Sequence, residues 1–167
     1  MGRLVEVVQN IGKATLGRLI QFWSPYYRKD IIKLERVQKR FTRMLPGLDD
    51  LSYKERLDRL GLFSLEHRRL SGDLIEVDKI MKAIDQLDSQ YLFPKVGVSK
   101  TRGHRFKVRG ERYKSVQRGN LFTQRVVSVW NKLPELVVET GTILSFKKHL
   151  DSYMGIERYG LNVGNWD

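Results

Sequence analysis

Residues 30–45 read DIIKLERVQKRFTRML, and this stretch indicates the fold class more clearly than any other part of the chain. Asp30 can cap the first amides of a helix, and Pro46 ends the pattern. Between them apolar residues recur at spacings of three and four, which places them on one side of a helix at about 100° per residue. These residues are Ile31, Leu34, Val37, Phe41, Met44 and Leu45. The stretch therefore predicts an amphipathic helix with one apolar side.

The opposite side of this helix is basic. It carries Lys33, Arg36, Lys39, Arg40 and Arg43. A solvated surface helix has the same pattern, so this stretch alone does not distinguish a binding surface from an ordinary exposed face. The choice between them depends on the rest of the chain.

Two further helices are predicted directly after this one. Ser52 and Glu55 have the spacing of a capping box, and Gly61 can end the helix that they begin. Ser64 can start a longer helix that reaches about residue 84, with an apolar stripe along one side. That stripe consists of Leu70, Leu74, Val77, Met81 and Ile84. Short connections between three amphipathic helices favour a compact bundle.

The composition changes after Asp85 and becomes rich in glycine and basic residues. Residues 95–118 contain nine Lys and Arg residues against one acidic residue, a net charge of +8 that makes up two thirds of the total. Within this segment residues 105–109, RFKVR, alternate with a period of two, which is typical of a strand with one buried face. Gly110 offers a turn, so both a small hairpin and an extended arm remain open.

Two helices are expected beyond this basic segment. Asn120 can cap the first, whose apolar residues line up as far as Leu133, and Pro134 ends it. The second covers about residues 143–154, with four side chains turned inward. These are Leu144, Phe146, Leu150 and Tyr153. The residues after them contain three glycines and few apolar anchors, and we expect them to be poorly ordered.

These patterns predict a mainly α fold, a compact helical bundle of about five helices with a basic, glycine-rich arm or small β-hairpin between helices. The expected segments are a loosely helical leader at 1–20, a helical bundle at 21–94, a basic arm at 95–119, C-terminal helices at 120–154 and a disordered tail at 155–167.

The composition limits the classes of function. The 167 residues carry a net charge of +12 with a pI near 10, which points to a polyanionic partner such as RNA or DNA. The absence of cysteine excludes disulfides and thiol catalysis. No apolar run approaches about 18 residues, so we expect no membrane partner. The location in the cell stays open, with the nucleus or the cytoplasm favoured.

No pattern for catalysis, a metal or a cofactor stands out. Asp49 and Asp50 form the one acidic pair that suggests metal catalysis, but they lie just before a helix cap, where the helix dipole by itself favours acidic residues. His67, His104 and His149 are far apart and lack metal-ligand spacing. We therefore expect no enzyme activity from this chain and no cofactor.

The candidate site consists of basic residues that could contact phosphates, with Phe106 and Tyr113 interleaved for stacking. The candidates in the helix are Lys33, Arg36, Lys39, Arg40 and Arg43, and those in the basic arm are Arg102, His104, Arg105, Lys107, Arg109, Arg112 and Lys114. The expected ligand is RNA, DNA or an RNA–DNA duplex. A solubilising loop would give the arm the same composition, and that alternative stays open.

Five stretches also carry a family resemblance. They are FWSPYYRKDIIKLERVQKRFTRML (22–45), LSYKERLDRLGLFSLEHRRLSGDLIEVDKIM (51–81), TRGHRFKV (101–108), FTQRVVSVWNKLP (122–134) and FKKHLD (146–151). In this order, over about four fifths of the chain, they resemble the C-terminal part of reverse transcriptases from non-LTR retrotransposons of the LINE, jockey-like type. Residues 1–20 depart from that pattern.

The resemblance implies a role. The chain would correspond to the helical thumb and C-terminal connector, which grip the template–primer duplex while a separate palm domain performs catalysis. By that analogy Lys33, Arg36, Arg40 and Arg43 would face a phosphate backbone. The family's catalytic carboxylates precede the matching region, so the chain would be a truncated, non-catalytic remnant of an RNA-directed DNA polymerase. The alternative is a transposon-derived orphan or structural protein with no selected activity.

Overall fold

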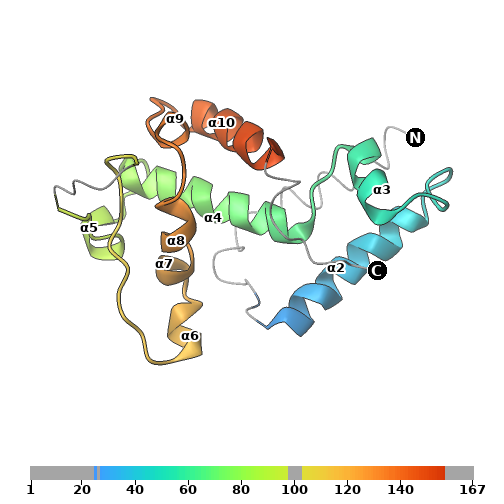
Figure 1. Cartoon of the computed structure of the whole chain (residues 1–167), viewed down its shortest axis with the longest axis horizontal. Coiled ribbons are helices and arrows are strands. Elements are labelled where there is room, and N and C mark those ends of the chain that lie inside the picture. Colours follow the sequence, from blue (N-terminus) through green and yellow to red (C-terminus); the bar gives the residue numbers. More distant parts are fainter. Residues whose placement is uncertain (1–24, 26, 98–102, 157–167) are drawn as a thin grey trace. The chain divides into compact units, whose positions relative to one another are not determined.

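The computed structural model describes residue 25 and residues 27–97 and 103–156, and these are mainly helical (Figure 1). Over these residues the structure has no β-strand, and its isolated β-bridge pairs Lys95 with Val108 in antiparallel fashion. The mainly α fold is thus confirmed. The predicted leader at 1–20, Arg102 and most of the predicted tail lie outside the described residues.

The chain divides into two compact units, unit 1 (Met1–Asp73) and unit 2 (Leu74–Asp167). Unit 1 contains α2 (Arg28–Arg43), α3 (Tyr53–Leu60) and the first half of α4 (Leu65–Met81). Unit 2 contains the second half of α4 together with α5 (Ser89–Leu92), α6 (Val116–Gly119), α7 (Phe122–Arg125), α8 (Val127–Trp130), α9 (Glu135–Val138) and α10 (Ile143–Ile156). Each unit is described by itself below.

The helix ends of unit 1 follow from local sequence signals. The Ser52 and Glu55 side chains each accept the other residue's backbone N–H, at 3.3 and 2.8 Å, which is the predicted capping box at the start of α3. Gly61 ends α3 with a φ of 62°, a conformation that favours glycine, and Leu62 closes the turn through its N–H to Leu57 O. Ser64 Oγ accepts the His67 N–H at 3.2 Å, so the predicted start of α4 is also confirmed.

Two predicted helix ends in this region were wrong. The N-cap of α2 is Tyr27, which makes no side-chain cap, and Asp30 lies in the first turn, where its charge still suits the helix dipole. The helix α4 ends at Met81 rather than near residue 84, because Ala83 adopts a φ of 53° that breaks the helical path. Ile84 is therefore exposed instead of continuing the buried stripe.

Polar side chains pack α2 against the rest of unit 1. Glu35 is buried and accepts hydrogen bonds from the Tyr53 hydroxyl at 2.5 Å and from the Leu65 N–H at 3.0 Å. Gln38 Nε2 donates to Phe63 O at 2.9 Å, and the buried Thr42 hydroxyl accepts from Arg56 Nε at 3.2 Å. The packed side of α2 thus carries a row of hydrogen-bonding groups. Two of them accept hydrogen bonds from the first N–H of α4 and from side chains of α3.

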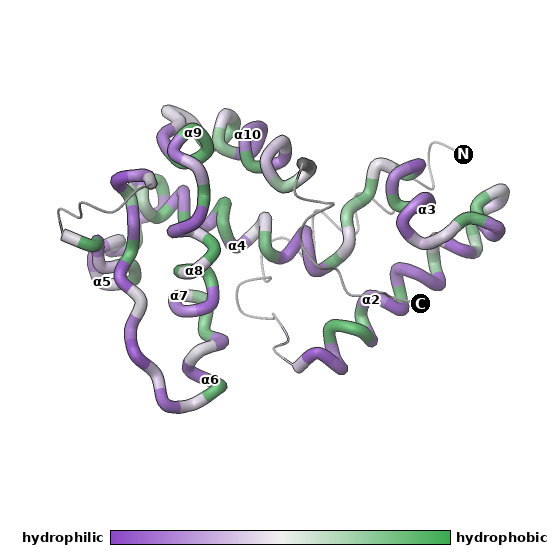
Figure 2. The backbone as a smooth tube through the Cα atoms, in the orientation of Figure 1, coloured by the Kyte–Doolittle hydropathy of each residue, from purple (hydrophilic) through white to green (hydrophobic). Residues whose placement is uncertain are grey.

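The predicted apolar side of α2 coincides with its packed side only in part. Ile31, Leu34 and Leu45 are partly buried, whereas Val37 and Met44 are 67% and 74% exposed, and Phe41 is exposed as well. The three exposed residues Val37, Phe41 and Met44 are here called the apolar stripe, and they lie between about a quarter and half a turn away from Glu35 and Thr42. Turning them inward would pull the Glu35 carboxylate away from its two donors and leave buried polar groups unsatisfied. Figure 2 shows hydrophobic positions along α2 between hydrophilic ones.

The burial of Glu35 also affects neighbouring titratable groups. Burial, reinforced by the hydrogen bond to the Glu35 carboxylate and by its charge, raises the pKa of the Tyr53 hydroxyl well above its ordinary value. Burial lowers the pKa of the Arg68 guanidinium, although the Glu35 charge works in the opposite direction. Unit 1 therefore has an interior whose stability depends on polar partners.

Unit 2 is built around an apolar core. Trp130 and Phe146 are fully buried, with ring centroids 6.0 Å apart, and Phe93 meets Phe122 edge to face at 5.7 Å. The second half of α4 and the C-terminal helices supply most of the remaining fully buried apolar side chains. The fully buried set also includes Leu74, Val77, Ile80, Val108, Val126 and Leu150.

Three predictions for the C-terminal helices were wrong in part. The region of the expected fourth helix consists of α7 and α8, and Asn120 forms the C-cap of α6, which lies in the predicted basic arm, instead of capping the helix that follows. Phe146 and Leu150 of α10 are buried as predicted, but Leu144 is 78% exposed. At the end of α6 the Asn120 side-chain amide donates to Val116 O, one turn back in the chain.

Candidate nucleic-acid interface

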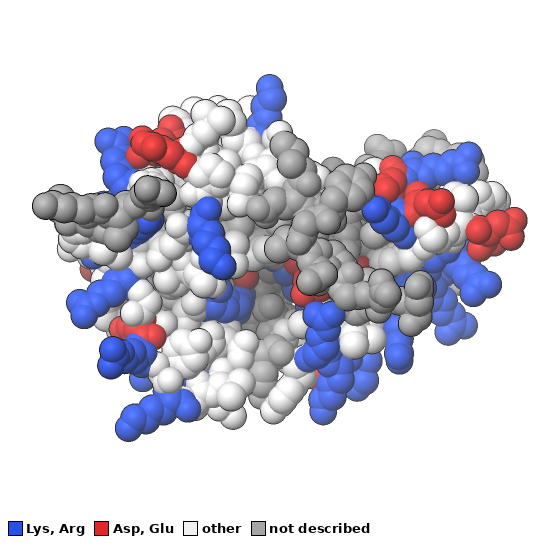
Figure 3. Space-filling model, viewed as in Figure 1, with Lys and Arg blue, Asp and Glu red and all other residues white. Residues whose placement is uncertain are grey.

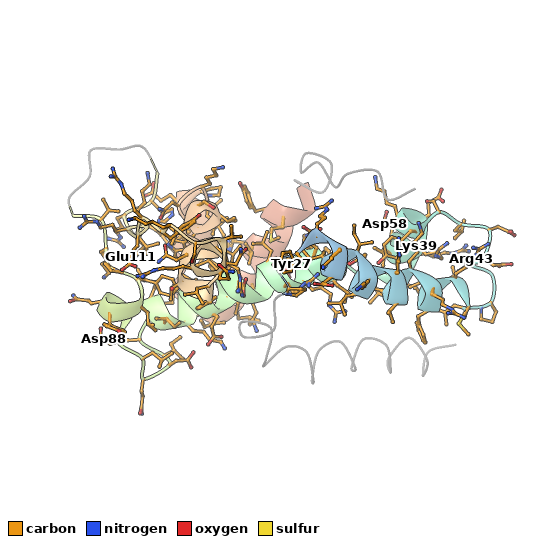
Figure 4. The ribbon with its side chains drawn as sticks, turned by 90° about the horizontal axis from the view of Figure 1, so that it is seen from below. Tyr27, Lys39, Arg43, Asp58, Asp88 and Glu111 are labelled. Carbon is orange, nitrogen blue, oxygen red and sulfur yellow. The ribbon has the colours of Figure 1, made fainter. Side chains whose placement is uncertain are left out.

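The first candidate surface is a row of cations on α2. Its members are Lys33, Arg36, Arg40 and Arg43, here called the cation stripe, and they lie on the solvent-facing part of the helix. Their spacings of three, four and three place them on one side of the helix over about 15 Å. Lys and Arg side chains project from the region of α2 in Figure 3, and Figure 4 labels Arg43 toward the C-terminal end of the helix. Lys39, also predicted, lies nearer the packed side and is only partly exposed.

The lysine and the arginines of the cation stripe differ in their contacts within the described residues. Lys33 Nζ lies 3.5 Å from an Asp30 carboxylate oxygen of the same helix. No ion pair within the described part of the chain joins Arg36, Arg40 or Arg43 to a carboxylate. Three guanidinium groups one helical turn apart, without acidic partners there, form a local positive potential that attracts phosphates.

The first part of the predicted basic arm is fixed against α8. His104 Nε2 lies 3.0 Å from Trp130 O, and Trp130 Nε1 donates to Phe106 O at 2.8 Å. The Asn131 amide donates to Val108 O and accepts the Val108 N–H, both at 2.9 Å. The segment 104–108 is therefore held beside α8 along its length. It is not a free arm.

The period of two predicted for this segment is confirmed in part. Val108 is buried and Arg105 and Arg109 are exposed, but Phe106 and the predicted site residue Lys107 are both partly buried. The bridge to Lys95 is flanked by hydrogen bonds from Val96 N–H to Lys107 O at 3.0 Å and from Arg109 N–H to Pro94 O at 2.7 Å. A short antiparallel pairing thus forms with residues 94–96.

This arrangement limits how two predicted site residues could contact a nucleic acid. His104 is buried with 2% of its surface exposed, so its predicted contact with a nucleic acid is wrong in this conformation. Its ring instead fills the space beside Trp130, edge to face at 5.8 Å. Arg105 remains exposed but pairs with Glu139 at 3.1 Å, which neutralises much of its charge.

The second candidate surface is the basic loop, residues 109–118. Arg109, Arg112 and Lys114 are exposed, and no ion pair in the described residues involves them. Arg109 and Arg112 also line a shallow hollow together with Pro94, Gly110 and Glu111. Figure 4 labels Glu111 at this place. These exposed cations are the candidates for phosphate contacts in unit 2.

Internal contacts hold the basic loop in shape. Arg118 Nη2 lies 3.0 Å from a Glu111 carboxylate oxygen, which closes the loop. Ser115 Oγ accepts the Arg118 N–H at 3.2 Å at the start of α6, and Glu111 N–H donates to Gln124 Oε1 at 3.2 Å. The loop is therefore anchored at both ends, and its cations Arg109, Arg112 and Lys114 project from a fixed frame.

Sequence reasoning missed one contact in this loop. Tyr113 packs on Gly119, so closely that a Cβ added to the glycine would lie 2.4 Å from Tyr113 Cε2. The sequence places the tyrosine among cations, but no local signal identifies the glycine as its neighbour. A small residue after a basic, aromatic segment is the one hint that could have been used.

Comparisons with protein-family models, with curated proteins and with solved structures gave no match. Within the described residues no cluster of three or more His, Asp and Glu side chains could hold a metal ion. None of the helices in the described ranges is long and apolar enough to cross a membrane. Asp49 and Asp50 lie exposed in the turn between α2 and α3.

Proposed function

We propose that this chain is a non-catalytic nucleic-acid-binding protein that contacts RNA or an RNA–DNA duplex through the phosphate backbone. The observation that carries the proposal is the presence of exposed cations without acidic partners among the described residues, in the cation stripe of unit 1 and in the basic loop of unit 2. Backbone contacts of this kind position a protein on a nucleic acid without reading its sequence. Little base specificity is therefore expected.

The chemistry of the residues supports a phosphate ligand. Arginine predominates in the cation stripe, and a guanidinium presents two parallel donors to a phosphate. Some other arginines of the chain have partners within the protein. Arg56 is buried against Thr42, and the exposed Arg105 pairs with Glu139. Arg36, Arg40 and Arg43 have no acidic partner among the described residues, which leaves their guanidinium groups available to an external anion.

The resemblance to the thumb and connector of LINE-type reverse transcriptases supports the same proposal, since those elements hold a template–primer duplex. It also supports the absence of autonomous polymerase activity, because the matching region of such enzymes lacks the catalytic carboxylates. A primer-extension assay with magnesium is expected to give no product.

Binding should be measured by fluorescence polarisation with a labelled RNA duplex and a labelled RNA–DNA duplex over a salt series. If about five phosphates are contacted, the slope of log affinity against log salt should lie near −4 to −5. The triple variant R36Q/R40Q/R43Q should bind more weakly, and its slope should be shallower by about one for each phosphate that it no longer neutralises. R59Q removes an exposed arginine of α3 outside the cation stripe and is the matched control. Absence of binding at about 50 mM salt, or binding that does not depend on salt, would contradict the proposal.

The exposed apolar stripe favours a second candidate, a transposon-derived protein with no selected activity. A domain that evolved beside a partner and now lacks it would expose such a surface and tend to associate. In that case the triple charge variant would behave like the wild type in binding assays while keeping its helix content. The same experiment therefore separates the two candidates.

A further inference from the structure

Tyr113 is the aromatic side chain of the basic loop, and its ring lies flat on a glycine. Three consecutive ring carbons of Tyr113 would lie 2.4, 2.8 and 3.0 Å from a Cβ built on Gly119. If the Cβ approached Tyr113 in the plane of the ring, the two carbons beside the nearest one would lie clearly farther from the Cβ than they do. Gly119 therefore contacts a face of the ring and not its edge.

Much of Tyr113 remains accessible beside this contact. The residue is 52% exposed, which leaves room for a ligand on the part of the ring that Gly119 does not cover. Gly119 is not in the left-handed region of φ, so its backbone does not require glycine. Glycine at this position allows the contact with Tyr113, because the Cβ of any other residue would displace the ring.

The loop that carries the ring is shaped by its own internal contacts. The ion pair between Arg118 and Glu111 closes the loop on both sides of Tyr113, and the Ser115 cap fixes the chain between Tyr113 and Gly119. An aromatic side chain that is already ordered loses little conformational entropy when a ligand stacks on it. The adjacent residues, Arg112 and Lys114, are exposed cations.

We infer that the basic loop binds single-stranded nucleic acid, with one base stacked on the uncovered part of the Tyr113 ring and the neighbouring phosphates on Arg112 and Lys114. This inference rests on the proposed nucleic-acid binding and specifies its ligand at this loop. Successive bases stacked on aromatic rings beside a basic groove are the usual mode of single-strand recognition. A duplex offers the same phosphates but keeps its base faces inside the stack, so it cannot use the ring.

The test compares a labelled oligouridine of about 12 nucleotides with a labelled RNA duplex, each titrated with the full chain at one salt concentration. Y113A should weaken oligouridine binding by about fivefold to about a hundredfold and should change duplex binding by less than about twofold. Y113L, which keeps an apolar contact with Gly119 but has no aromatic face, should behave like Y113A, and Y113F should retain affinity. Circular dichroism of each variant checks that the fold is kept.

Two further variants test whether the loss of oligouridine affinity arises from the Tyr113 ring. Y91A removes an even more exposed tyrosine of unit 2 that has no Lys or Arg within three residues in the sequence, and it should leave both affinities unchanged. G119A keeps Tyr113 but displaces its ring, and should weaken oligouridine binding in the same direction as Y113A.

The outcomes separate the inference from the proposal on which it rests. If the wild type binds neither probe, the proposed function fails and the inference fails with it. If the wild type binds both probes and Y113A and Y113L match it, the inference alone is overturned. Equally weakened binding of both probes by Y113L would overturn it too, because Tyr113 would then only position the cations.

Discussion

The two units of this chain differ in the residues that pack their helices, although unit 1 also buries Leu48, Leu57 and Leu62. In unit 1, α2 packs through Glu35 and Thr42 while Val37 and Met44 face solvent. In unit 2, Trp130 and Phe146 fill an apolar core. A helix with both polar and apolar sides can thus bury either one, and the choice depends on which groups elsewhere need hydrogen-bond partners. The Glu35 carboxylate accepts hydrogen bonds from both the first N–H of α4 and the Tyr53 hydroxyl.

The largest effect is expected in the core of unit 2. F146A removes a fully buried ring of α10, and should lower the free energy of unfolding by about 3–5 kcal/mol because the cavity cannot be filled. L144A is the matched control, two residues away on the same helix and 78% exposed, and should cost less than about 1 kcal/mol. Urea titrations followed by circular dichroism measure both. Similar destabilisation by the two variants would show that Leu144 is packed and that the contrast is wrong.

A smaller effect should come from the polar interior of unit 1. Y53F removes the hydroxyl that donates to Glu35, and should cost about 1–2 kcal/mol at neutral pH because the buried carboxylate is left without that donor. The raised pKa of Tyr53 gives this contribution a pH dependence. It is intact below about pH 10, where the unfolded tyrosine keeps its proton, and it declines as the pH rises beyond that value.

Urea titrations at several alkaline pH values test this dependence. The wild type should lose stability more steeply than Y53F above about pH 10, so that the difference between them shrinks. Y91F changes an exposed tyrosine and serves as the control, which should follow the wild type at every pH. A constant difference between the wild type and Y53F would mean that the hydroxyl is not held by Glu35.

Local signals predicted the fold, and contacts distant in sequence decided what the prediction missed. The capping box at Ser52 and the glycine end at Gly61 were correct because each depends on residues within one or two turns. The packed side of α2 was not predictable in this way, since Glu35 meets partners 18 and 30 residues away. Nothing in the periodicity of α2 alone encodes those partners.

The candidate site shows the same division. Helical spacing predicted that the cations of α2 would share one exposed side, and Lys33, Arg36, Arg40 and Arg43 do, whereas Lys39 is only partly exposed. His104 and Arg105 belong to an equally basic stretch. However, His104 contacts Trp130, 26 residues away, and Arg105 forms an ion pair with Glu139, 34 residues away. Net charge identifies a basic segment, whereas only tertiary packing shows which of its cations remain available.

The smallest effect on stability is expected from the apolar stripe. V37Q/M44Q replaces two exposed apolar side chains with a good helix former, and should change the free energy of unfolding by no more than about 0.5 kcal/mol. V77A, at a fully buried valine of α4, provides the comparison and should be clearly destabilising. The double variant should instead reduce self-association at high protein concentration in sedimentation velocity, because the exposed apolar area is smaller. A drop in stability as large as that of V77A would mean that the stripe is packed, and the difference between the two units would then disappear.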